Sequence, residues 1–169
     1  GGDFNTTGGL MYCGQSGGLI YEIWYRLTGA SGLSGSTITV AYTQLYGRQI
    51  STPSNRIYAE DAAAPAAPTS SANYLGKTLT TASVVWSGFG ATNAWNTSPS
   101  IVSVIQELAD SYDPSVIQIM QKDNASANGA YAQFDTYDNA SGNDAKLHIE
   151  YTAGGAAVAP SRMMMGVGV

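Results

Sequence analysis

Few residues in this chain are of the types that carry catalysis, and they are scattered. His148 is the only histidine, and it stands within the strand-like sequence KLHIEY, where we expect a structural or surface role. Nucleophilic catalysis needs a nucleophile, a base and an orienting group, and glycoside hydrolysis needs two carboxylates facing each other across a cleft. The acidic residues fall on different expected elements, without the spacing of such a pair: Glu22, Glu60, Asp61, Glu107, Asp110 and Glu150. The sequence therefore predicts a domain that does not catalyse a reaction.

Two loops of similar composition are candidates for a metal site. Residues 123–129 read DNASANG, and residues 138–144 read DNASGND. Calcium prefers oxygen ligands from Asp, Asn and backbone carbonyls, although alanines here stand where an EF-hand would place ligands. The same residue types suit tight turns for conformational reasons alone. We expect turns and no cofactor, and we keep a calcium site as the alternative, with three candidate ligands: Asp123, Asp138 and Asp144.

Aromatic rings on a protein surface can stack on sugars, and one segment holds several of them. Residues 86–95 read WSGFGATNAW and are expected to form a glycine-rich loop. Trp86 is expected in the core, whereas Phe89 and Trp95 are candidates for stacking on a glycan. Sequons of the form Asn-X-Ser/Thr mark candidate N-glycosylation sites. Four occur in this chain: Asn5, Asn96, Asn124 and Asn139.

The composition limits the classes of partner. Only 11% of the residues are charged, against roughly a quarter in typical soluble domains. Seven lysines and arginines in a chain of net charge −5 cannot form a basic face, so nucleic acid is excluded as a partner. No apolar run is long enough to span a membrane. We expect an extracytoplasmic protein in which Cys13, the only cysteine, is a small buried residue, or else pairs with another chain.

Most of the chain is expected to form short strands. Residues 36–46 (STITVAYTQLY) are strongly β-prone, but both faces of this strand are half apolar, so its inward face stays open. Residues 61–73 contain two prolines and small residues, which indicates a long surface connection. The last three strands are expected to be joined by hairpins. Strands are expected at residues 19–27, 36–46, 55–60, 77–81, 83–86, 116–121, 130–137 and 146–152.

One segment has helical spacing. Ile101, Val104, Ile105 and Leu108 recur at the intervals of an amphipathic helix, which predicts one short helix near residues 99–110. Ser98 is the expected N-cap, followed by Pro99 at the first helical position. The strands and this helix together predict an all-β fold, an antiparallel, jelly-roll-like β-sandwich.

Five segments in this order resemble the DNRLRE-type β-sandwich module of secreted bacterial and archaeal proteins and of phage structural proteins. They read STITVAYTQLY, NRIYAED, GKTLTTASVVW, SPSIVSVIQELAD and YAQFDTYDNASGNDAKLHIEY, and the resemblance spans residues 5–152. The motifs that carry it fall on residues 37–41, 78–86, 101–107 and 137–151. The resemblance implies the sandwich fold. It also implies a role either in carbohydrate binding or as a part of adhesins, wall proteins and virions.

The chain departs from this family at its start and adds an apolar tail at its end. The usual first strand, ahead of residues 5–9, is missing or truncated, which predicts an open groove or sheet edge in the sandwich. We expect a sandwich domain at residues 1–152 and a tail at residues 153–169. The tail either packs on its own domain or inserts into a neighbouring subunit. Its expected assembly residues are Met163, Met164, Met165, Val167 and Val169.

These observations favour a non-catalytic structural subunit of an extracellular assembly, such as a fibre or the surface of a virion. Its expected partners are copies of itself or another structural protein, which would contact it through the tail and the open sheet edge. The alternative is a carbohydrate-binding or adhesion module with a glycan as its ligand. The expected location is extracellular, at the cell surface or on a virion.

Overall fold

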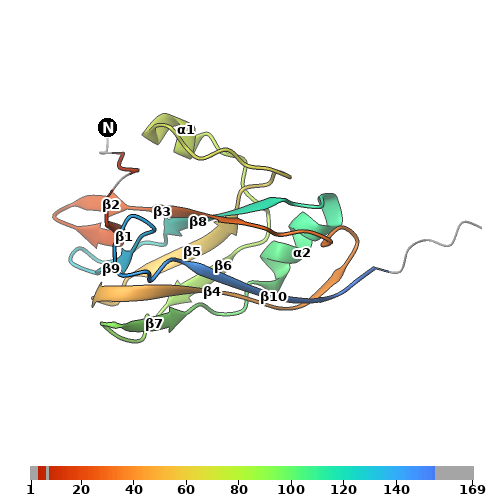
Figure 1. Cartoon of the computed structure of the whole chain (residues 1–169). Coiled ribbons are helices and arrows are strands. Elements are labelled where there is room, and N and C mark those ends of the chain that lie inside the picture. The colour runs from red at the N-terminus through yellow and green to blue at the C-terminus, as the bar shows by residue number, and fades with distance from the viewer. Residues whose placement is uncertain (1–3, 7, 155–169) are drawn as a thin grey trace, which may run out of the picture.

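The computed structural model describes residues 4–6 and 8–154, in which two antiparallel sheets enclose one core (Figure 1). The sheet of six contains β1 (Leu10–Ser16), β2 (Leu19–Tyr21), β4 (Thr37–Ile50), β7 (Ala94–Thr97), β9 (Tyr131–Asp135) and β10 (Lys146–Thr152). The sheet of four contains β3 (Ile23–Thr28), β5 (Ser54–Ala59), β6 (Val84–Ser87) and β8 (Val116–Asp123). Two helices are α1 (Ser71–Leu75) and α2 (Val102–Ser111). The predicted all-β sandwich is confirmed, whereas the predicted assembly residues Met163, Met164, Met165, Val167 and Val169 lie outside the described residues.

The long strand β4 organises the sheet of six. Gln44 pairs with β10 and also with β7, so these two strands lie on opposite sides of β4. Gly47 pairs with β9 and also with β7, which places β9 opposite β7 as well. β9 and β10 therefore follow one another along the same side of β4. Residues 136–145 loop out between them.

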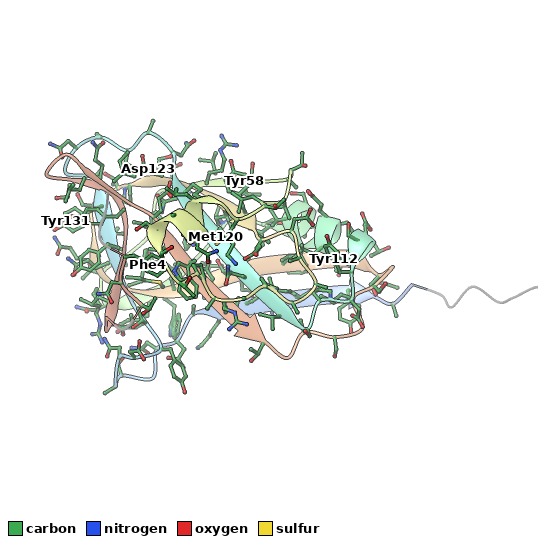
Figure 2. All side chains as sticks on the ribbon, turned by 90° about the horizontal axis from the view of Figure 1, so that it is seen from above. Phe4, Tyr58, Tyr112, Met120, Asp123 and Tyr131 are labelled. Atoms are coloured by element: carbon green, nitrogen blue, oxygen red, sulfur yellow. The ribbon has the colours of Figure 1, made fainter. Side chains whose placement is uncertain are left out.

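The last two loops are not the hairpins that the sequence predicts. Residues 124–130 carry the chain from β8 in one sheet to β9 in the other, and β9 and β10 both pair with β4. Asp123 and Tyr131 flank the first of these loops, and Figure 2 shows them at the end of the sandwich opposite Tyr112, which follows α2. Two loops of similar composition therefore need not both form hairpins. Whether the two strands that a loop joins also pair with each other depends on other strands of the sheets.

A β-bulge in β4 explains why the sequence does not predict which face of this strand points into the core. The register of the β4–β10 pair shifts at Thr39, which stands opposite no residue of β10 in the register and donates its hydroxyl to the Glu150 carbonyl. An extra residue on one strand reverses the alternation of its side chains. Before the bulge β4 buries Ile38, and after it β4 buries residues of the opposite parity: Ala41, Thr43 and Leu45.

The predicted helical stripe is confirmed, although the predicted N-cap is wrong. Ile101, Val104, Ile105 and Leu108 are all 0% exposed, and α2 lies between the two sheets at one end of the sandwich (Figure 1). The hydroxyl of Ser98 does not cap this helix. It accepts a hydrogen bond from the Thr43 backbone N–H of β4 and donates one to the Pro99 carbonyl.

Polar side chains lie inside the sandwich as well as apolar ones. The Gln121 amide donates to the Tyr25 hydroxyl at 2.9 Å, and that hydroxyl donates to Thr43 Oγ1 at 3.1 Å, which links the two sheets.

Cys13 is completely buried, as predicted, and burial raises the pKa of its thiol to about 12.

A buried thiol with a raised pKa contains almost no thiolate at neutral pH, and the thiolate is the reactive form. We therefore expect Cys13 to resist a thiol reagent at pH 8 in the folded protein and to react completely in urea. With a disulfide reagent that releases a coloured thiolate on reaction, the absorbance of that product measures the fraction of Cys13 that has reacted. Rapid labelling of the native protein would contradict the buried position of Cys13.

Several predicted boundaries shift. The connection predicted at residues 61–73 contains the start of α1, and the loop predicted at residues 86–95 contains the start of β7. The strand predicted at residues 77–81 is reduced to an isolated bridge between Leu79 and Glu60. The strand predicted at residues 19–27 divides at Glu22 into β2 and β3, which belong to different sheets.

Candidate interaction surface

Two edge strands, one from each sheet, line the same open side of the sandwich. β10 pairs only with β4 among the described residues, and β3 pairs only with β8. Each edge strand has one unpaired side, on which backbone N–H and C=O groups point away from the sheet. Open edges are therefore present at β10 and β3, and among the described residues β2, near the start of the chain, is also an edge strand that pairs only with β1.

A groove of about 430 Å³ lies between these edges. Leu147 and Ile149 of β10 form one wall, and they are half-buried and pack on the core. Leu27 of β3 and Ala30 after it form the other wall, and Ile117 of β8 adds a fully buried side chain. Arg26, Thr28 and Gly29 complete the lining. The groove is thus lined by apolar side chains together with polar groups, which include unpaired backbone groups of the two edge strands.

The chain leaves the sandwich beside this groove. The Tyr151 hydroxyl reaches the Ser31 carbonyl at 3.5 Å, which holds the end of β10 against the loop that follows β3. Gly154 passes so close to the Gly35 carbonyl that no Cβ would fit at this position. Gly154 therefore lies against the loop that follows β3.

The two aromatic residues predicted to stack on a glycan have different environments. Phe89 is 5% exposed and packs on Trp86 and Phe134, with ring centroids 4.3 and 5.3 Å away. The prediction is therefore wrong for Phe89, which is a core residue. Trp95 is half-buried on the outer side of the sheet of six, where its ring and that of Tyr46 form a T-shaped pair with centroids 5.5 Å apart.

His148 lies on the surface, as predicted. Its ring stacks on Tyr42 with centroids 4.8 Å apart, and its Nε2 lies 2.9 Å from a carboxylate oxygen of Glu150. The other acidic residues considered for catalysis have partners in separate parts of the fold. Glu22 pairs with Lys122 and Glu60 with Lys77, while Glu107 accepts hydrogen bonds from two backbone N–H groups that precede β6.

The three aspartates predicted as alternative calcium ligands do not form one site. Asp123 accepts hydrogen bonds from the Ser126 backbone N–H, which is the turn geometry expected of that loop. Asp138 is exposed and Asp144 is half-buried, both in the loop after β9. In residues 4–6 and 8–154, no three Asp, Glu, His or Cys side chains lie close enough together to hold a metal ion.

Asp135, which sequence analysis did not single out, organises this second loop. Its side chain is 0% exposed, and its carboxylate accepts a hydrogen bond from Arg48 Nε at 2.6 Å. It also accepts hydrogen bonds from Asn139, Ser141 and Asn143 at 2.8, 2.8 and 3.1 Å. One buried carboxylate thus holds both the β4 side chain and the loop that separates β9 from β10.

The predicted glycosylation sites differ in their exposure. Asn5 is exposed, whereas the amides of Asn124 and Asn139 are half-buried and donate hydrogen bonds to Ser54 Oγ and the Gly9 carbonyl. Asn96 is only 3% exposed, and its side chain bonds the backbone of Ala91 and Ala94. The prediction is wrong for Asn96, because the folded domain encloses its amide.

Replacing Asn96 with alanine removes three hydrogen bonds that hold the turn before β7. These backbone groups are part-buried, and leaving them without partners costs free energy, so we expect the free energy of unfolding to fall by about 1–2 kcal/mol. Urea denaturation measures this. Thr92→Ala, at an exposed position of the same turn, is the control and should change stability by less than about 0.5 kcal/mol. Equal effects of the two variants would contradict a structural role for Asn96.

None of the helices in the described part of the chain is both long and apolar enough to cross a membrane. Comparison with protein families, with curated proteins and with solved structures finds no match. The resemblance to the DNRLRE-type module therefore stays a prediction from sequence motifs.

Proposed function

We propose that this protein is a non-catalytic structural subunit of an extracellular assembly, such as a fibre or the surface of a virion. In this proposal, the subunit takes up an extended apolar segment of a neighbouring subunit at the open edge. The low charge supports the proposal, since few charges have to be desolvated when subunits meet.

The observation that carries this proposal is the groove between β10 and β3. An edge strand with unpaired backbone groups is a template for a further strand. The half-buried side chains of Leu147 and Ile149 provide a place for the alternate side chains of such a strand. Main-chain hydrogen bonds would give affinity and the apolar groove would give specificity, as in other cases of strand addition.

The test places a charge in the groove of the full chain. Ile149→Lys should weaken self-association at least about tenfold, because a lysine cannot replace the apolar surface that a partner would bury. Light scattering over a concentration series measures this. His148→Lys, on the opposite face of the same strand, is the matched control and should associate like the unchanged protein.

A second groove variant guards against misfolding. Ala30→Asp changes a half-buried residue in the loop after β3 and should also prevent association, and thermal unfolding of this variant checks that the domain stays folded. A full chain that stays monomeric at all concentrations, or groove variants that associate normally, would overturn the proposal that the subunit assembles with copies of itself.

A carbohydrate-binding role is the second candidate, and Trp95 is the observation that favours it. Trp95 and Tyr46 meet at 78° on the outer side of the sheet of six, next to the Gln44–Thr97 hydrogen bond. Lys146 Nζ lies 3.8 Å from the Trp95 ring centroid, so a sugar on that face would have to displace it. Retention on insoluble polysaccharides that Trp95→Ala abolishes, and that Tyr137→Ala at an exposed loop position leaves unchanged, would favour this role.

A further inference from the structure

We propose that the segment taken up by the groove is residues 163–169 of a second copy of this chain, added as a strand beside β10. This inference rests on the function proposed above and names the partner of that surface. The groove and β10 belong to the described residues, whereas residues 163–169 lie outside them.

The segment has the side-chain pattern that a groove with one apolar side requires. Successive side chains of a strand point to opposite faces. In a strand, Met163, Met165, Val167 and Val169 would share one face, while the other face would carry Met164 and two glycines. The apolar face fits the lining of the groove, in which Leu27, Ala30, Ile117, Leu147 and Ile149 meet.

The length of the segment also fits. β10 contains seven residues, and residues 163–169 are the same number. At about 3.3 Å per residue, both extend about 23 Å. A strand of this length can pair along the whole free edge of β10.

If the tail folded back onto β10 of its own chain by the shortest route, the residues that reached the free edge of β10 would be poorly suited to a strand. A tight hairpin after Gly154 would bring residues 156–162, AAVAPSR, alongside β10. Pro160 lacks the N–H that a ladder needs, Arg162 is charged, and Val158 is the only large apolar residue. This hairpin would leave residues 163–169 beyond the groove, whereas a segment from a second copy can enter it without reversing the chain.

The preceding residues then act as a connector. Residues 153–162 are mostly small and can span up to about 33 Å between two subunits. Because the tail of one copy binds the groove of the next, donor and acceptor surfaces differ. Such a head-to-tail contact repeats without closing unless the rotation forms a ring, so it builds a fibre.

The first test uses cross-linking in the full chain. Ile149→Cys in the groove and Met165→Cys in the tail are combined, and the folded protein is treated with a short bismaleimide. Cys13 is buried and should not react. We expect a ladder of cross-linked dimers, trimers and larger species on a denaturing gel, with no ladder from either single variant. A cross-linked monomer that migrates faster would show that the tail binds its own groove, and would overturn the inference.

The second test uses the alternation of side chains. Met165→Asp should weaken self-association by about 10- to 100-fold, because one buried methionine side chain is lost and a charge is added. Met164→Asp, on the other face, should change it by less than about threefold. Equal effects of the two variants, or no effect of either, would contradict the proposed strand.

The outcomes separate this inference from the proposed function. If Ile149→Lys and Ala30→Asp prevent association but both tail variants associate normally, the groove binds another segment and only the inference fails. If neither the groove variants nor the tail variants change association, both fail.

Discussion

Replacing Asp135 with alanine should lower the free energy of unfolding by about 3 kcal/mol or more at pH 7. The Asp135 side chain is 0% exposed, and removing its carboxylate leaves the donors of Arg48, Asn139, Ser141 and Asn143 without their acceptor. Removing one partner of a buried, hydrogen-bonded ion pair is strongly destabilising. Because Arg48 is one-third exposed and can reach water, we expect a value at the lower end of the usual range. Urea denaturation measures the difference.

The control for this variant is Asp138→Ala in the same loop. Asp138 is exposed, so its loss should change stability by less than about 0.5 kcal/mol. If Asp135→Ala is as mild as this control, the hydrogen bonds to Asp135 do not hold the loop.

The effect of Asp135 should depend on pH. Burial on its own would raise the pKa of this carboxyl, but hydrogen bonds from Arg48, Ser141 and Asn143 outweigh burial and hold the pKa below its ordinary value. The folded state therefore binds fewer protons here than the unfolded state. The contribution is present above an unfolded pKa of about 4 and is lost as the pH falls through the lower folded pKa. The difference between the unchanged protein and Asp135→Asn should shrink between pH 6 and pH 2, and a constant difference would contradict this.

Replacing Phe89 with alanine should lower the free energy of unfolding by about 3–4 kcal/mol. Phe89 packs on Trp86 of the sheet of four and on Phe134 of the sheet of six, so it joins the two sheets. Truncating a buried phenylalanine removes its transfer free energy and leaves a cavity. Thermal and urea unfolding both measure the loss.

Trp95→Ala is the matched aromatic control for this variant. Trp95 is half-buried on an outer surface, so its truncation should cost only about 1–2 kcal/mol. A Phe89→Ala variant that is as stable as the unchanged protein would show that Phe89 lies on the surface, and would restore it as a candidate for binding glycans.

The elements that local sequence encodes could be predicted, and those that distant residues determine could not. The spacing of Ile101, Val104, Ile105 and Leu108 predicts α2, because an apolar stripe at helical intervals depends on no other segment. The N-cap could not be predicted in the same way, since the Ser98 hydroxyl instead bonds β4, which is far away in the sequence. β7 was missed because the glycine-rich sequence around it resembles a loop.

The open edge of the candidate surface could not be predicted either, because it depends on residues that are far apart in the sequence. The apolar alternation of Leu147 and Ile149 is visible in the sequence, but it predicts only a strand with one buried face. That β10 lies at an edge follows from its pairing, which among the described residues is with β4 alone, and the groove needs β3 of the other sheet on its far side. Asp135 was missed for a related reason, because its partner Arg48 is 87 positions away.

The interruption between β9 and β10 creates a place where foreign sequence can be displayed. Both strands are held by β4 independently, so the connecting residues do not set the register of either strand. Gly142, at the tip, has a φ of +68° and open space around it. Each doubling of a flexible loop costs only about 0.6 kcal/mol. A peptide inserted at Gly142 would separate Ser141 from Asn143, so it has to leave their hydrogen bonds to Asp135 in place; it would then recur once per subunit along the proposed polymer.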